Sequence, residues 1–211
     1  MCVSTQLELA SLYEAIDAVN AGDPNVVEWN GESVPRSLLQ GQRATTWLPQ
    51  VFSTSSTAPS TAPSTTPSTA LSIAARAHHL ARWSIARASY PDGRAGYLRW
   101  RKASKAASAD LLVTTLAPFG VVVEVVGRAV DLIQRVGLGS DPEAQAIEDV
   151  ACLVFLETDY VSLLQRLGSE STAGAVRKTL KKMSPAAIEL GVDATPIGAA
   201  RDLLLEVAST S

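Results

Sequence analysis

The sequence predicts an all-α protein, because helical spacing of apolar residues dominates the chain and extended segments are nearly absent. Apolar residues recur every three or four positions in long stretches on both sides of one Ser/Thr/Pro tract. Only one short run, Val26 to Trp29, is typical of a strand. The 211 residues suffice for one hydrophobic core but hardly for two. We therefore expect a single compact helical domain over residues 1–211.

The first fifty residues are expected to form two helices with a hairpin between them. Apolar residues from Leu7 to Val19 recur at helical spacing, and Gly22 is a plausible helix stop. Val26–Trp29, followed by Asn30-Gly31, indicates a short extended piece with a hairpin turn. Pro35 then begins the second helix, which carries apolar residues as far as Leu48.

Residues 53–69 contain only Ser, Thr, Ala and Pro, and part of this tract repeats with a proline at every fourth place. Such residues bury little apolar area, and the regular prolines are incompatible with a helix. The tract therefore reads as a low-complexity, disordered insert within the domain. A neutral insertion into a surface loop is favoured over a phosphorylated or glycosylated linker.

Helical spacing resumes at Ala70 and continues to the end of the chain. Val121–Val126 has the composition of a strand but runs into helical spacing, so a helix is favoured there. Asp141-Pro142-Glu143 is a typical helix start, with a capping Asp, a Pro in the first position and a Glu in the first turn. The expected helices cover residues 70–87, 95–116, 121–133, 142–167, 172–183, 185–190 and 196–207.

Composition and charge favour a soluble, cytoplasmic protein. The net charge of −3 argues against a broad nucleic-acid footprint. The two cysteines, Cys2 and Cys152, are poor candidates for a disulfide, which indicates a reducing compartment. No secretory signal begins the sequence, and no apolar run reaches the roughly 18 residues of a membrane span.

Two adjacent carboxylates, Glu148 and Asp149, lie in the helix expected over residues 142–167, which is apolar nearly all round. A carboxylate in such a helix loses hydration unless it meets a cation, a metal ion or several hydrogen-bond donors. Two interpretations stay open. The carboxylates form a structural salt bridge with one of the arginines, or they serve as a metal ligand and a catalytic general base.

The only two histidines are adjacent, at positions 78 and 79, on the helix expected over residues 70–87. Neighbouring helical residues point about 100° apart, so the two rings cannot share one site without a bent geometry. His79 would share a face with Arg82 and Trp83. A single such histidine is more often structural than a ligand, and both interpretations are kept.

A third cluster combines arginines with aromatic residues over Arg94–Lys102, where Arg94, Arg99 and Arg101 alternate with Tyr and Trp. Guanidinium groups recognise phosphate or carboxylate through forked hydrogen bonds, and they stack on aromatic rings. Together with Arg82 and Trp83 they could bind a small phosphorylated or acidic ligand. The alternative is that they form internal salt bridges with the buried carboxylates.

The sequence lacks the common glycine-rich nucleotide loops, a Gly-x-Ser-x-Gly elbow and paired Cys-x-x-Cys motifs. Several ordered blocks nevertheless resemble one family, the domain of unknown function 4202. They extend over about residues 7–190, apart from the insert. The blocks are Ile16–Asn20, Asp23-Pro24-Asn25, Gly41-Gln42-Arg43, Ala74–Trp83, Ser89-Tyr90-Pro91, Arg94–Arg101, Asp141–Gln145 and Glu148–Glu157.

The resemblance implies a helical arrangement similar to that of the metal-dependent HD-type phosphohydrolases. It would make His79 and Asp149 ligands of a divalent metal ion, with the arginines holding phosphate. Members usually carry a histidine about seven residues after the Trp100-Arg101 pair, whereas this chain has none there. Asp110 could substitute for it as an oxygen ligand. A degenerate phosphohydrolase is therefore expected, with a non-catalytic binding module as the alternative.

Some members of the family also carry the label glutamyl-tRNA synthetase, and Lys181–Ser184 is similar to the Lys-Met-Ser loop of class I synthetases. The partner motif of such enzymes is absent, and the chain is too short for a nucleotide fold with an anticodon domain. A synthetase-related function is therefore the least favoured of the three.

Overall fold

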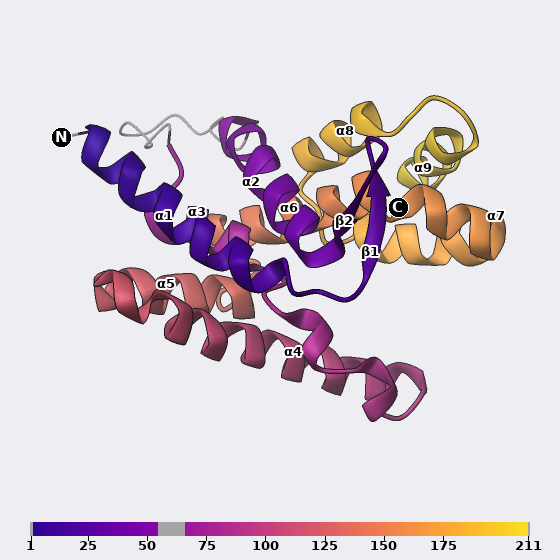
Figure 1. Cartoon of the computed structure of the whole chain (residues 1–211). Helices are drawn as coiled ribbons and strands as arrows, with labels where there is room; N and C mark the ends of the chain where they lie inside the picture. The colour runs from indigo at the N-terminus through magenta and orange to yellow at the C-terminus, as the bar shows by residue number, and fades with distance from the viewer. Residues whose placement is uncertain (1, 55–65, 211) are drawn as a thin grey trace. The chain divides into compact units, whose positions relative to one another are not determined.

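The all-α prediction is confirmed by a computed structural model, which describes residues 2–54 and 66–210. In this part of the chain, nine α-helices and one two-stranded hairpin make up the regular structure, with three short 3₁₀ turns (Figure 1). The elements are α1 (Cys2–Asn20), β1 (Val26–Trp29), β2 (Glu32–Pro35), α2 (Arg36–Thr54), α3 (Thr69–Ala77), η1 (Arg82–Ser84), η2 (Arg87–Ser89), α4 (Gly93–Leu116), η3 (Ala117–Phe119), α5 (Val123–Gln134), α6 (Pro142–Thr158), α7 (Tyr160–Leu180), α8 (Pro185–Ala194) and α9 (Ala199–Ser209).

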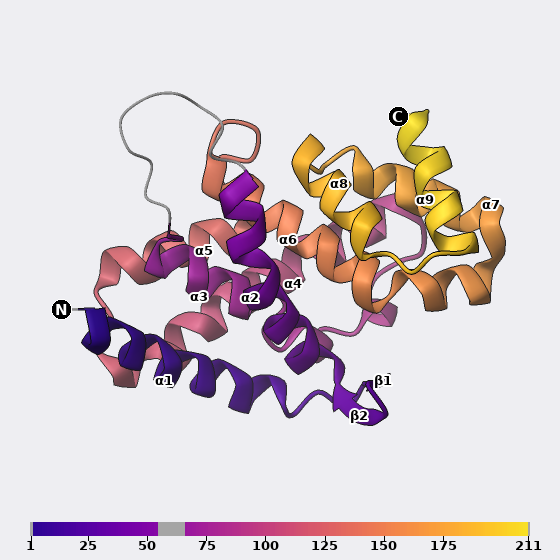
Figure 2. The same ribbon diagram turned by 90° about the horizontal axis from the view of Figure 1, so that it is seen from above.

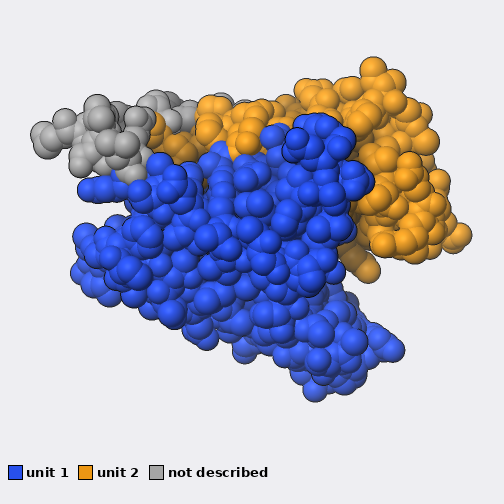
Figure 3. Space-filling model, in the orientation of Figure 1, with its two compact units in different colours: residues 1–45, 68–136 blue, residues 46–67, 137–211 orange. Residues whose placement is uncertain are grey.

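The chain divides into two compact units, which Figure 3 shows in different colours. Unit 1 comprises residues 1–45 and 68–136, and unit 2 comprises residues 46–67 and 137–211. The boundary falls within α2, so this helix contributes its first half to unit 1 and its second half to unit 2. The expectation of a single domain over residues 1–211 stays a prediction.

Unit 1 is built around α3, a short helix that is buried on nearly every side. It packs against α1 and α5, and α4 runs alongside α5 (Figure 1). Most of its buried residues are alanines, whose small side chains allow neighbouring backbones to approach closely. At Gly41 of α2 the approach is so close that a Cβ there would lie 2.6 Å from the Arg76 carbonyl oxygen of α3.

The hairpin between α1 and α2 is confirmed as an antiparallel pair, with Val26 opposite Pro35 and Trp29 opposite Glu32. Its two turn residues, Asn30 (φ 53°) and Gly31 (φ 84°), both lie in the left-handed region. A two-residue hairpin turn of this type favours the sequence Asn-Gly, because these residues tolerate positive φ best.

Unit 2 is assembled around α6, which packs against α7 and α8, while α9 packs against α7 and α8 (Figure 2). The expected start of α6 is confirmed: the Asp141 side chain accepts from the backbone N–H of Glu143 and Ala144, and Pro142 occupies the first turn. The second half of α2 is attached through Trp47, whose Nε1 donates to Glu157 Oε2 of α6 at 2.8 Å.

The predicted length of the helix over residues 142–167 was wrong. α6 ends at Thr158, and α7 begins at Tyr160 and includes most of the segment expected as a separate helix over residues 172–183. Within that range Gly168 has non-helical dihedral angles (φ 73°, ψ 172°). Apolar spacing continues across the boundary between α6 and α7, because Tyr160 at the start of α7 is fully buried. Periodicity alone therefore does not reveal where α6 ends.

Most of the predicted insert, residues 55–65, lies outside the described residues. Its first two residues, Ser53 and Thr54, belong to the end of α2, and its last, Thr69, begins α3. Across residues 2–54 and 66–210, no helix is both long enough and apolar enough to span a membrane.

Candidate functional site

The segment that carries both histidines leaves the helix earlier than expected, so the prediction of one helix over residues 70–87 was wrong beyond α3. Ala81 adopts a left-handed conformation (φ 46°, ψ 32°), and two short 3₁₀ turns follow. Side chains from other helices satisfy the backbone here. Asn20 Oδ1 of α1 accepts from the Ala81 N–H at 3.2 Å, and Ser108 Oγ of α4 donates to the Leu80 carbonyl at 2.7 Å.

The half-buried His79 has both ring nitrogens engaged within unit 1. Its Nε2 lies 2.6 Å from Arg82 Nη1, and its Nδ1 lies 2.9 Å from Gln40 Oε1. A guanidinium group can only donate, so Nε2 must accept. The ring proton therefore sits on Nδ1 and is donated to the Gln40 side chain. This pair of contacts selects one tautomer of the neutral imidazole.

Burial and surrounding positive charge hold the pKa of His79 well below its usual range. Burial has the largest effect, and the His78 ring and the guanidinium groups of Arg82, Arg135 and Arg101 lower it further. The three arginines come from η1, α4 and the C-terminal end of α5. We call Arg82, Arg101 and Arg135 the arginine cluster. Each of the three lowers the pKa of the half-buried His79 ring in unit 1.

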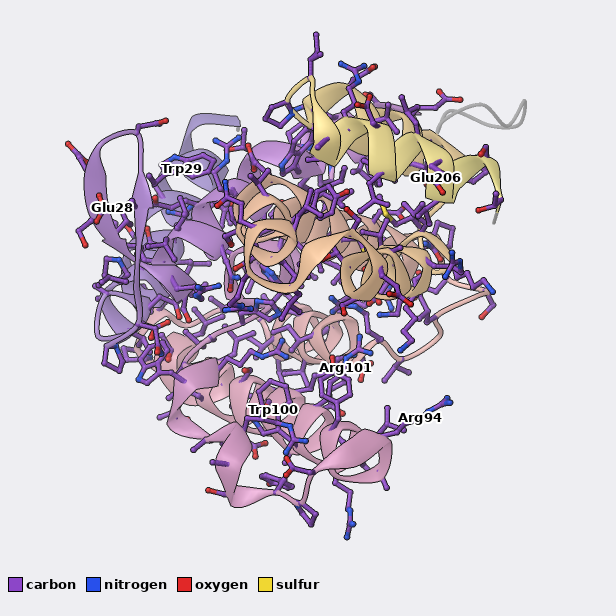
Figure 4. The ribbon with its side chains drawn as sticks, turned by 90° about the vertical axis from the view of Figure 1, so that its right-hand side faces the viewer. Glu28, Trp29, Arg94, Trp100, Arg101 and Glu206 are labelled. Atoms are coloured by element: carbon purple, nitrogen blue, oxygen red, sulfur yellow. The ribbon has the colours of Figure 1, made fainter. Side chains whose placement is uncertain are left out.

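Arg82 is also fixed by an aromatic ring. Its guanidinium lies over the Trp100 ring, 4.6 Å from the centroid, and Trp100 Nε1 donates to the Ile85 carbonyl at 2.8 Å. The Tyr97 ring lies 5.8 Å from that of Trp100. Figure 4 shows Trp100 beside Arg101 on α4. Stacking and hydrogen bonding together leave Arg82 little rotational freedom.

The remaining arginines and the tryptophan named from the sequence have different surroundings. Arg94 and Arg99 are exposed on α4, and Arg94 extends away from Trp100 and Arg101 (Figure 4). Trp83 is half-buried and lies close to Gly22, in the turn after α1. A role of Arg94, Arg99 or Trp83 in ligand binding stays a prediction.

In unit 2, the two predicted carboxylates are buried on α6 and bonded to the loop before α8. Asp149 Oδ1 accepts from the Ser184 N–H at 2.8 Å and from Gln145 Nε2 at 2.9 Å. Glu148 Oε1 lies 3.7 Å from Lys182 Nζ. Burial raises the pKa of Asp149 despite the opposing hydrogen bonds, and the Glu148 carboxylate adds a smaller contribution in the same direction. The contact with Lys182 is an ion pair of the kind that the structural interpretation expects, and both interpretations of the carboxylates stay open.

The divalent metal site that the resemblance implied requires several ligand side chains to converge. None of the described residues form a group of three or more His, Cys, Asp or Glu side chains able to hold a metal ion. His79 uses its Nε2 lone pair to accept from Arg82 Nη1. His79 belongs to unit 1 and Asp149 to unit 2. Their pairing around a metal ion, with Glu148 as general base, stays a prediction.

Two residues that complete the surroundings of His79 were not anticipated from the sequence. Gln40 lies in α2 and Arg135 ends α5, so both are far from His79 in the chain. Arg135 has a left-handed backbone (φ 67°), and its Nη1 donates to the Leu132 and Ile133 carbonyls. No motif distinguishes Arg135 from the other arginines. Only the packing of α3 against α5 places it near His79.

Comparison with known proteins identifies a family without an assigned activity. A family model described as a domain of unknown function (DUF4202) matches residues 10–203, which confirms the resemblance noted in the sequence. No curated protein and no solved structure matches the chain.

Proposed function

The chain belongs to the DUF4202 family, and we propose that it is a non-catalytic domain that binds a small phosphorylated ligand through the arginine cluster. One observation carries this proposal: the half-buried His79 ring lies among arginines from three separate elements, and its Nε2 lies 2.6 Å from Nη1 of Arg82. Guanidinium groups donate paired hydrogen bonds that match the geometry of phosphate oxygens. The proposal keeps the cytoplasmic location expected from the sequence.

His79 positions Arg82 in this proposal. Its Nε2 accepts one N–H of the guanidinium, while the Trp100 ring supports the guanidinium face. The other N–H groups of Arg82 then face a fixed direction. A binding site whose donors are held in place loses less conformational entropy when the ligand arrives.

The proposal differs from a metal-dependent phosphohydrolase in what it asks of His79. A metal ligand needs a free lone pair, whereas the Nε2 lone pair of His79 accepts from Arg82. The anion-binding role needs a ring that accepts from Arg82, and the Arg82 contact and the lowered pKa of His79 both support it. The arrangement thus favours the binding interpretation, and no feature of the described residues favours a synthetase.

Calorimetric titration with pyrophosphate tests the proposal. We expect saturable binding that Arg101→Ala weakens by about tenfold, the effect of losing one charge-assisted hydrogen bond of roughly 1.5 kcal/mol. Lys102→Ala is the matched control, because it removes one positive charge from an exposed position next to Arg101 on α4. Manganese chloride titrated in parallel should give no binding heat.

The two variants distinguish a specific site from general attraction of anions. Binding that falls equally in Lys102→Ala and Arg101→Ala would reflect only the overall charge of α4. The absence of pyrophosphate binding by the unmodified protein, or stoichiometric manganese binding that requires His79, would contradict the proposed function.

A further inference from the structure

An exposed aromatic ring beside the arginine cluster indicates which kind of phosphorylated ligand the site accepts. Tyr97 is 43 % exposed, although its ring is in contact with the half-buried ring of Trp100. Trp100 in turn supports Arg82 of the arginine cluster. Two aromatic rings, tilted by 42° to each other, therefore continue outward from Arg82.

Helix geometry places Tyr97 next to the cluster on α4 as well. Arg101 follows Tyr97 by four residues, and Trp100 follows it by three, so each of them neighbours Tyr97 on the helix surface. A phosphate held by Arg101 and Arg82 would therefore have an aromatic ring within the reach of one nucleoside. An inorganic phosphate would leave that ring unused.

We propose that the ligand is a mononucleotide, with its phosphate on the arginine cluster and its base stacked on Tyr97. This inference rests on the proposed function, because it assigns a substrate class to the same site. Every base has a π face and can stack on an aromatic ring. We therefore expect the site to prefer ligands that carry a base, without selecting one particular base. The small size of the cluster and the net charge of −3 favour a mononucleotide over a nucleic-acid strand.

The test compares AMP with ribose 5-phosphate, because these two compounds share the sugar and the phosphate and differ by the base. Titration calorimetry should show AMP binding about tenfold more tightly, within the range that stacking one base on an aromatic side chain provides. Tyr97→Ala should lower the affinity for AMP to that for ribose 5-phosphate. Tyr97→Phe, which keeps the ring, should retain the preference.

Leu98→Ala is the matched control, since Leu98 is the next residue on α4 and is similarly exposed. It should leave both affinities unchanged. Tyr97 is exposed, so its variants should keep the fold, and circular dichroism checks this. Equal binding of AMP and ribose 5-phosphate, or a Tyr97→Ala variant that loses affinity for both, would overturn the inference.

The outcomes also separate this inference from the proposed function. If pyrophosphate and ribose 5-phosphate bind but AMP binds no more tightly, the site holds phosphate without recognising a base, and only the inference fails. If no phosphorylated compound binds, the proposed function fails with it. A single-stranded oligonucleotide that binds much more tightly than AMP would replace the mononucleotide with a nucleic-acid strand.

Discussion

Arg82 donates from Nη1 to His79 Nε2 at 2.6 Å, and this contact determines what His79 can do. It occupies the lone pair that a metal ion would need, and it selects the tautomer that donates to Gln40. The sequence pointed to the same two residues, but as neighbours on a helix with the histidine as a metal ligand. In the structure, the histidine orients a cation.

The low pKa of His79 makes the stability of the protein depend on pH. The folded pKa lies below the usual value of about 6.5 for the unfolded chain, so the unfolded chain takes up the proton first. The contribution of His79 to the free energy of unfolding is fully present above about pH 6.5. It is lost as the pH falls below that value, by up to about 1.4 kcal/mol per pH unit.

Urea unfolding between pH 5 and 8 measures this dependence, and His79→Gln should remove most of the slope below pH 6.5. A variant that keeps the full slope would show that another group is responsible.

Gly96 in the first turn of α4 has no room for a side chain. A Cβ there would lie 1.8 Å from the Pro91 carbonyl oxygen, so Gly96→Ala must displace the turn that leads into α4. We expect a loss of about 1–3 kcal/mol in the free energy of unfolding, which is typical of overpacking. Gly127→Ala in α5 is the control, because a Cβ there meets nothing within 4 Å.

Alanine suits a helix better than glycine by about 0.5–1 kcal/mol, so the Gly127 variant should be slightly stabilised. Thermal unfolding of the two variants side by side gives the comparison. Equal effects of the two substitutions would contradict the packing around Gly96.

Asp149 should tolerate an amide better than an alanine. Its Oδ1 accepts from the Ser184 N–H and from Gln145, whereas its buried Oδ2 has no hydrogen-bond partner among the described residues. Asp149→Asn can keep the Oδ1 contacts without burying a charge. Asp149→Ala leaves the Ser184 N–H unpaired, while Gln145 Nε2 keeps its contact with the Lys182 carbonyl. The alanine variant should cost about 1–3 kcal/mol more than the amide variant in urea unfolding at pH 7.

The raised pKa of Asp149 makes the stability of the protein depend on pH in the opposite direction to the lowered pKa of His79. Its contribution to stability is present below the usual carboxyl pKa of about 3.9 and is lost as the pH rises through the raised folded value. The unmodified protein should therefore lose stability relative to Asp149→Asn as the pH rises from 4 to 7. A constant difference between the two proteins over that range would contradict the assignment.

The ion pair between Arg76 and Asp17 links α3 to α1. Arg76 Nε donates to Asp17 Oδ1 at 2.7 Å, Nη2 donates to Oδ2, and the guanidinium lies 5.1 Å from the Tyr13 ring centroid. Lysine cannot form the paired contact, so Arg76→Lys should cost about 1.5–3 kcal/mol. The exposed pair of Arg201 and Asp193 is the control, and Arg201→Lys should cost less than about 1 kcal/mol.

Chemical unfolding of both lysine variants measures the difference. An Arg76→Lys variant as stable as Arg201→Lys would mean that the forked contact contributes little.

Local signals in the sequence were sufficient for most elements of the fold. The Asp141-Pro142-Glu143 start of α6 and the Asn30-Gly31 turn each depend on the chemistry of a few adjacent residues, and both are confirmed. The end of α3 could not be read in this way. Its termination depends on Asn20 and Ser108, which bond to the backbone of residues 80 and 81 from other helices.

The residues of the candidate site likewise divide into those that the sequence pointed to and those that it did not. His79, Arg82 and Arg101 stood out because histidines are rare in the chain and because arginines alternate with aromatic residues. Gln40 and Arg135 have no comparable signal, since each is an ordinary polar residue in its own helix. They reach His79 only through tertiary packing, which no pattern of sequence spacing describes.

Nitrogen-15 NMR of the His79 ring tests the central claim most directly, with His79→Gln assigning the signal among the two histidines. We predict a neutral ring protonated at Nδ1, with a pKa well below 6.5 that rises when pyrophosphate is added, because a bound anion offsets the charge of the arginine cluster. An ordinary pKa that pyrophosphate leaves unchanged, or a shift of Nε2 on addition of manganese, would contradict the account.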